Sequence, residues 1–180
     1  MTGRPSSASP RIQAHVAGAF YVMAVLAAAF GEVLLHGRLA FAFGLMAVAS
    51  FVLVTLVLYT LFKPVSALVA LLAASSNLVG LSLEALQLHL RGANVALIFH
   101  GLYCVFIGVL IFRSGFLPRA LGVLITLGGL AWFTDLSIPL TNHLAPFDVI
   151  VGFIGEGLPM LWLLVIGVNV QRWNDGVRAA

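Results

Sequence analysis

Charged residues are scarce in this sequence. Lys, Arg, Asp and Glu make up 8% of the 180 residues, whereas 62% are hydrophobic and the mean hydropathy is +1.12. A chain of this composition cannot cover a water-exposed surface with polar groups, which excludes an ordinary soluble domain. The sequence therefore predicts an integral membrane protein.

Several other absences exclude familiar kinds of site. Cys104 is the only cysteine, so no internal disulfide can form, and packing is its expected role. No lysine falls within an apolar run, which excludes a retinal Schiff base. The sequence contains no HExxH, CxxC or CxxCH motif and no phosphate-binding glycine loop. It also lacks a basic stripe with interleaved aromatic residues, so we expect no nucleic-acid partner, and we predict no metal and no cofactor.

Long apolar runs dominate what is present. Each is close to the roughly 20 residues that a helix needs to cross the hydrocarbon core, and none alternates as a barrel strand would. We predict an all-α, polytopic membrane helix bundle with one transmembrane domain over residues 15–172 and tails over 1–14 and 173–180. Its six expected transmembrane helices are Val16–Leu35, Leu39–Phe62, Val65–Leu90, Asn94–Phe112, Pro118–Ile138 and Phe147–Gln171.

The cations indicate the orientation of these helices. In a six-helix topology only Arg38 and Arg91 fall on one side, and the other seven Lys and Arg residues fall on the opposite side. Flanking cations are retained on the cytoplasmic side, so we expect both termini to be cytoplasmic. The predicted location is the cell (plasma) membrane, with a multi-pass topology and membrane lipids as partners.

Acidic residues and histidines gather in the outer half of this predicted topology. Glu84, His100 and Glu156 are expected about two turns or more inside the membrane, where an ionisable group needs a partner or a proton. We therefore predict these three as catalytic residues. A structural hydrogen-bond cluster that fastens helices together is the alternative interpretation.

Helical spacing places further polar groups on shared faces. An ionised side chain that faces lipid costs about 2.5 kcal/mol or more, so such faces should turn toward other helices and form a shared pocket that opens outward. The alternative for the shallower residues is simple solvation at a helix end. The pocket or relay residues predicted in this way are Glu32, His36, Asn77, Gln87, Trp132, Asp135 and Asp148. Four acid and histidine positions on four helices would also permit a metal site, but that pattern is not specific.

The last apolar run contains a predicted helix break. Pro159 has no N–H, so the carbonyl of Gly155 loses its helical partner directly beside Glu156. The surrounding glycines leave room for a neighbouring helix or a ligand. Other glycines, at Gly101, Gly108, Gly128 and Gly129, are expected to be contacts between closely packed helices.

Three stretches resemble a known family. These are FHGLYCVFIGVLIFRSGFLPRALGVLITLGGL at Phe99–Leu130, IGEGLPMLWLLVIG at Ile154–Gly167 and RIQAHVAGAFY at Arg11–Tyr21. They are similar to the bacterial membrane family called domain of unknown function 4386, with its RSGFLPRxLG turn and its GE-x-x-x-x-x-WLL ending. The resemblance implies a multi-span bacterial membrane protein and no established activity. The resemblance also implies that His100, Glu156 and Glu32 occupy positions that are typical of the family.

Three classes of function remain open at this point. The first is an acid/base enzyme for a lipophilic, isoprenoid- or lipid-like substrate, in which Glu84 or Glu156 is the proton donor and His100 the base or relay. The second is a small proton-coupled transporter, which would need a homodimer. The third is an accessory or scaffold subunit whose polar residues specify helix packing. We favour the enzyme from the sequence.

Overall fold

The computed structural model describes residues 9–33, 36–88 and 94–179, and all the regular elements in these ranges are helical. Two helices begin at side-chain caps, because Ser66 accepts from the Val69 amide and Asn94 from the Ala96 amide. The elements are α1 (Pro10–Val33), α2 (Arg38–Phe62), α3 (Ala67–Ala85), α4 (Val95–Ser114), α5 (Arg119–Ala131), the 3-10 helix η1 (Trp132–Leu136), α6 (Ile138–Leu144), α7 (Phe147–Val165) and α8 (Val170–Ala179).

Five of these helices, α1, α2, α3, α4 and α7, are long and apolar enough to cross a membrane. The prediction of a multi-pass helical membrane protein is therefore confirmed. The fifth predicted span is divided into the 13-residue α5 and the five-residue η1. At 1.5 Å per residue α5 alone extends about 20 Å, less than the hydrocarbon thickness. A sixth crossing and the cytoplasmic placement of both termini stay predictions.

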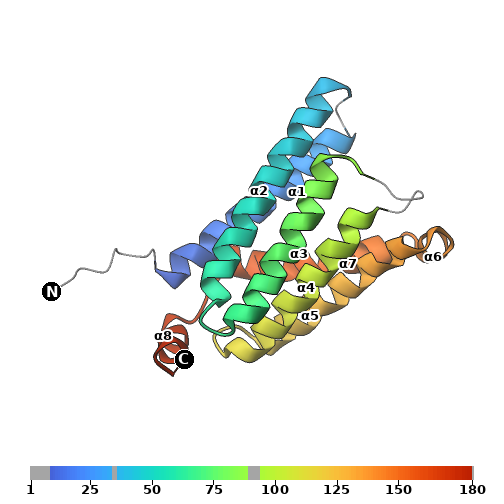
Figure 1. Cartoon of the computed structure of the whole chain (residues 1–180). Coiled ribbons are helices and arrows are strands. Elements are labelled where there is room, and N and C mark those ends of the chain that lie inside the picture. Colours follow the sequence, from blue (N-terminus) through green and yellow to red (C-terminus); the bar gives the residue numbers. More distant parts are fainter. Residues whose placement is uncertain (1–8, 34–35, 89–93, 180) are drawn as a thin grey trace.

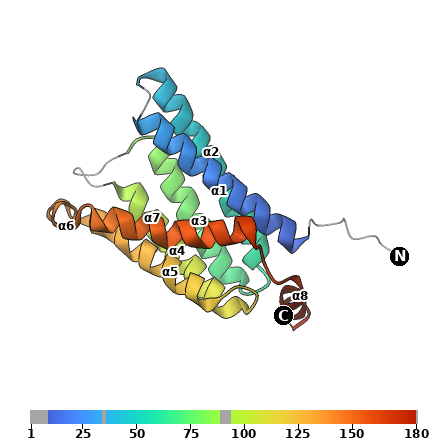
Figure 2. The ribbon, with the colours of Figure 1, turned by 180° about the vertical axis from the view of Figure 1, so that it is seen from behind.

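The helices pack as neighbouring pairs. The hairpin of α1 and α2 extends to one side, and α3 packs between α2 and α4 (Figure 1). The α5 helix packs against both α4 and α7, while α7 crosses the back of the bundle and also meets α1 (Figure 2). The start of α1 and the terminal α8 lie at the same end of the bundle.

Two glycine contacts draw α4, α5 and α7 close together. A Cβ atom on Gly155 of α7 would lie 2.7 Å from the Cα of Gly128 in α5, and one on Gly101 of α4 would lie 2.6 Å from the carbonyl oxygen of Gly129. No real side chain tolerates such distances, so these backbones can approach only because both positions are glycine. The predicted packing roles of Gly101, Gly128 and Gly129 are thus confirmed. His100 and Glu156, the sequence neighbours of these glycines, are carried toward one another.

The last predicted span is shorter than expected. Helix α7 ends at Val165 because Gly167 adopts a positive φ of 77° and its amide bonds back to the Trp162 carbonyl. The chain then forms the separate helix α8. The indole of Trp173 in α8 donates to the Leu61 carbonyl at 3.0 Å, which attaches this helix to the end of α2.

Candidate functional site

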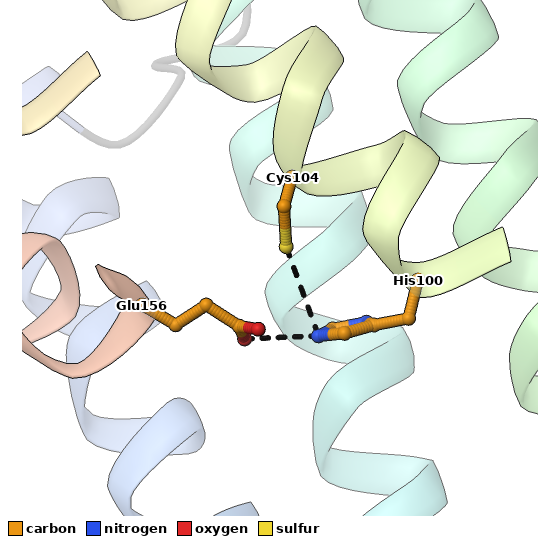
Figure 3. A group of neighbouring side chains, drawn as sticks. All are labelled: His100, Cys104 and Glu156. Atoms are coloured by element: carbon orange, nitrogen blue, oxygen red, sulfur yellow. Dashed lines mark hydrogen bonds and ion pairs between the residues drawn. The ribbon is translucent and has the colours of Figure 1, made fainter. Parts of the chain in front are cut away.

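The centre of the bundle contains a connected group of polar side chains, here called the buried centre. Its two principal members are His100 on α4 and Glu156 on α7, whose side chains are 15% and 6% exposed. The Nε2 atom of His100 lies 2.9 Å from Oε2 of Glu156 (Figure 3). The remaining members come from five other positions: Tyr21, Thr55, Asn77, Cys104 and Trp132.

A line of hydrogen bonds fixes the imidazole of His100. Its Nδ1 lies 2.9 Å from Oδ1 of Asn77, and Nδ2 of Asn77 donates to the Thr55 hydroxyl at 2.7 Å. Thr55 in turn donates its single hydrogen to the Phe51 carbonyl at 2.8 Å. Thr55 can therefore only accept from Asn77, so the atom of Asn77 that faces it is the amide nitrogen. The amide oxygen of Asn77 then faces His100, and because this oxygen can only accept, Nδ1 of His100 must carry a proton. These contacts connect α4 to α3 and α2.

The orientation of the imidazole determines what lies between His100 and Glu156. Because Nδ1 is a donor, Nε2 is left to face the carboxyl group, and the pair holds one labile proton in the 2.9 Å between Nε2 and Oε2. The proton can sit on either atom, and the pair has no net charge in both cases. A neutral pair avoids most of the cost of placing an isolated ion in a membrane.

Glu156 is held by two further donors. The indole Nε1 of Trp132, at the start of η1, donates to Oε1, and the hydroxyl of Tyr21 on α1 donates to Oε2 at 3.4 Å. Trp132 is placed there because it follows the α5–α7 crossing at Gly128 by one helical turn, and its ring lies directly against Gly152. The carboxyl group therefore has a fixed orientation.

Aromatic rings surround the polar pair. The rings of Phe51 and Tyr103 have their centroids 5.7 and 5.8 Å from the imidazole of His100, and Tyr21 makes an edge contact with Phe51. Tyr103 is only 3% exposed, and its hydroxyl is the buried side-chain oxygen that makes no hydrogen bond among the described residues. The hydroxyl of Thr55 lies close enough to interact with it.

The structure brings together four of the predicted site residues, Glu156, His100, Asn77 and Trp132. It does not bring in Glu84, which lies in the last turn of α3 with an exposed side chain. Helix α3 ends at Ala85 and not at Leu90, so Glu84 lies at the end of the helix and not two turns before it. Two other residues assigned to the predicted pocket, His36 and Gln87, are exposed at helix ends.

Asp148 is buried, but it belongs to a separate contact. Its Oδ2 accepts from the hydroxyl of Thr134 at 3.0 Å, and its Oδ1 accepts from the Val149 amide in the first turn of α7. A carboxylate there interacts favourably with the helix dipole. The side chains of the remaining two predicted residues, Glu32 and Asp135, lie outside the described part of the structure.

The predicted helix break is not an interruption of the helix. Helix α7 continues through Pro159 to Val165, although the carbonyl of Gly155 still lacks a partner N–H from position 159. The role of Gly155 is the close contact with α5, so its effect on Glu156 comes from packing.

The described cavities lie away from the buried centre. One of about 220 Å³ is lined by the α2–α3 and α4–α5 turns together with Trp173 and Gly176 of α8. Another, of about 160 Å³, lies on the outer face of α1 near Phe20. Neither is lined by His100 or Glu156, so the outward-opening pocket stays a prediction.

Sequence reasoning did not identify Tyr21 and Thr55 and gave Cys104 only a packing role. Cys104 follows His100 by one helical turn, and its Sγ lies 3.8 Å from Nε2. That spacing was visible in the sequence as an i, i+4 pair. Tyr21 and Thr55 gave a weaker signal, because a single hydroxyl in an apolar run usually bonds to its own helix.

The chain is similar to other proteins over much of its length. The sequence pattern of the family described as "Domain of unknown function (DUF4386)" matches residues 80–167. Residues 80–167 belong to this family. The DUF4386 segment includes His100, Cys104, Trp132 and Glu156, whereas Tyr21, Thr55 and Asn77 precede it.

A relative from Archaeoglobus fulgidus is 25% identical over 129 residues, which cover 67% of this chain and 79% of the relative. That relative is described as an uncharacterized protein. No solved structure has a significant match to the chain. The comparisons thus place residues 80–167 in the DUF4386 family and name no activity, so the chemistry has to be argued from the buried centre.

Proposed function

We propose that this protein is a membrane-embedded enzyme that acts on a lipophilic, isoprenoid- or lipid-like substrate at the buried centre. The observation that carries the proposal is the 2.9 Å contact between Nε2 of His100 and Oε2 of Glu156, in which a neutral pair shares one labile proton. An acid and a base in contact, both with fixed orientation, are what general acid–base catalysis requires. The cell (plasma) membrane is the proposed location.

Each residue of the buried centre has a distinct role in this proposal. Glu156 gives the proton to the substrate, and His100 accepts or returns it. Asn77 is a positioning residue, because its amide oxygen holds Nδ1–H and keeps Nε2 toward the carboxyl group. Trp132 is a second positioning residue, because its indole holds the other carboxyl oxygen.

The surroundings favour a lipophilic substrate with one polar group. The aromatic rings beside His100 provide an apolar contact surface for a carbon skeleton. The buried hydroxyl of Tyr103 can bond to the polar group of a substrate. Entry from the bilayer suits such a molecule, since the lipid-facing sides of the helices are apolar.

The hydrogen-bond line gives less support to a proton-coupled transporter. From His100 the line passes through the amide of Asn77 and ends at the carbonyl of Phe51. Neither an amide nor a backbone carbonyl readily passes a proton onward, so this line of hydrogen bonds orients His100 and does not conduct protons. The other branch runs from Glu156 to the hydroxyl of Tyr21, and no onward hydrogen bond from that hydroxyl is found among the described residues.

The decisive experiment compares lipids that co-purify with the wild-type chain, Glu156→Gln and Glu84→Gln in mild detergent. Native mass spectrometry and lipid extraction follow each sample over hours of incubation. We expect a co-purified lipid to be converted by the wild type and by Glu84→Gln, and to remain unconverted on Glu156→Gln.

Two results would contradict the enzyme. Conversion at the wild-type rate by Glu156→Gln excludes Glu156 as the acid. A Glu156→Gln variant that loses thermal stability, alongside a wild type that converts no bound lipid, supports the scaffold interpretation in its place.

A further inference from the structure

Three side chains of different chemistry converge at one point of the buried centre. They are the imidazole Nε2 of His100, the thiol of Cys104 and a carboxylate oxygen of Glu156, and all three atoms lie within 4.8 Å of one another (Figure 3). His100 and Cys104 are four residues apart on α4 and so share one face, while Glu156 approaches from α7. We propose that these residues form a binding site for a divalent transition-metal ion of the zinc class.

Two of the three distances between these ligand atoms come near those of tetrahedral coordination. Bonds of about 2.0–2.1 Å to nitrogen, 2.0–2.2 Å to oxygen and 2.3 Å to sulfur place neighbouring nitrogen and oxygen ligands about 3.3 Å apart, and nitrogen and sulfur about 3.6 Å apart. In the structure Nε2 of His100 is 2.9 Å from Oε2 of Glu156 and 3.8 Å from Sγ of Cys104. Nε2 and Oε2 would have to separate by about 0.4 Å and Nε2 and Sγ to approach by about 0.2 Å, while the carboxylate oxygen and Sγ, which lie within 4.8 Å of each other, would have to reach about 3.6 Å.

The partners of these ligands support the same assignment. Metal-binding histidines usually donate their other ring N–H to a protein oxygen, which fixes the ring and its tautomer. His100 does this through Nδ1 and the amide oxygen of Asn77. Glu156 is likewise held by Trp132 and Tyr21. The ligands are therefore oriented before any ion arrives.

Charge balance also favours a divalent ion. Binding displaces the one proton shared by His100 and Glu156 and the thiol proton of Cys104, so two protons leave for each ion bound. A divalent ion with one carboxylate and one thiolate has no net charge, which suits a site buried in a membrane. Three protein ligands leave one coordination position open, the pattern of catalytic and not structural zinc sites.

This inference rests on the proposed function for the location of the reaction and extends it by naming a cofactor. When the ion is bound, His100 and Glu156 are its ligands and share no proton, so the ion, in place of Glu156, would activate the polar group of the substrate as a Lewis acid. Binding itself can be tested without any substrate.

Cobalt(II) is the best probe, because Cys104 is the only cysteine of the chain and a thiolate-to-cobalt absorption band can arise only from it. The full-length protein in detergent is treated with a chelator, titrated with Co²⁺ and then with Zn²⁺. We expect one Co²⁺ per chain with a near-ultraviolet charge-transfer band, lost on addition of Zn²⁺. The band should be absent from Cys104→Ser and unchanged in His143→Gln, which alters an exposed histidine.

Ligand and partner variants make the test specific. His100→Gln and Glu156→Gln should lower the zinc affinity at least tenfold, and Trp132→Phe, which changes a partner and leaves every ligand in place, should lower it about 10- to 100-fold. A folded wild type without the band overturns the proposal, as does an unchanged zinc affinity in His100→Gln. Lipid conversion by the metal-free protein would contradict a metal cofactor and support the proposed enzyme. Specific Co²⁺ binding without any lipid conversion would support the metal site and contradict the proposed enzyme.

Discussion

His100 and Glu156 are 56 residues apart in sequence, yet their side chains meet at 2.9 Å in the interior of the bundle. The glycine beside each of them makes this possible. Gly101 packs against Gly129, and Gly155 packs against Gly128, so that α5 is held tightly between α4 and α7. The buried centre is therefore a product of close backbone packing as well as of polar side chains.

Gly155→Ala should destabilise the protein. A Cβ at this position would lie 2.6 Å from the Leu124 carbonyl oxygen, and overpacking of this kind costs about 1–3 kcal/mol. Gly157→Ala is the matched control, since nothing lies within 4 Å of its Cβ and alanine favours a helix by up to about 1 kcal/mol. Thermal unfolding in detergent measures both. Equal melting temperatures for the two variants would contradict the close α5–α7 contact.

Asn77→Leu should lower stability by about 1–3 kcal/mol, because it leaves the Nδ1–H of His100 and the hydroxyl of Thr55 without their partner in an apolar interior. Ser75→Ala, two residues earlier on the same helix, removes only an exposed hydroxyl that bonds within α3, and should change little. Thermal unfolding again provides the measurement. A tolerated Asn77→Leu would show that the line from His100 to Phe51 contributes no stability.

Trp132→Phe should slow lipid conversion about tenfold, the rate equivalent of roughly 1.4 kcal/mol, because it removes one hydrogen bond from the carboxyl group of Glu156. The ring is largely retained, so the fold should persist. Trp162→Phe, which changes a tryptophan of α7 outside the buried centre, is the control. Initial rates of lipid conversion by the two variants test the prediction. Identical rates would show that Trp132 does not position Glu156.

Asp148→Asn separates a structural carboxylate from a catalytic one. The amide can still accept from Thr134, but it loses the favourable interaction with the start of α7, worth about 0.3–1 kcal/mol. We expect a slightly lower melting temperature and an unchanged rate of lipid conversion. A rate loss comparable to that of Glu156→Gln would instead return Asp148 to the relay role that the sequence suggested.

The sequence was sufficient for the class of protein and for the main members of the buried centre. Continuous apolar runs indicate spanning helices, and an ionisable residue inside such a run requires a partner, which identified His100 and Glu156. The glycines at Gly101, Gly128 and Gly129 were also recognisable as packing contacts. These inferences depend on composition and local spacing alone.

The ends of the helices were harder to predict than their existence. Glu84 was placed inside the membrane on the assumption that α3 reached Leu90, but the helix stops at Ala85.

Three-dimensional partners were not predictable either. Tyr21 reaches Glu156 only through the crossing of α1 over α7, where Gly18 lies directly against Leu164, and no spacing in the sequence encodes that crossing.

The hairpin of α1 and α2 contributes Tyr21, Phe51 and Thr55 to the buried centre, whereas His100, Cys104, Trp132 and Glu156 all come from α4, η1 and α7. An outward swing of this hairpin would break the bonds from Tyr21 to Glu156 and from Asn77 to Thr55 and withdraw the Phe51 ring. It would leave the contacts of His100 with Glu156, and of Glu156 with Trp132, in place. For the proposed enzyme, sideways entry of a lipid at the boundary between the hairpin and the remaining helices would therefore release the bonds from Tyr21 and Thr55 and keep the direct contact between the acid and the base.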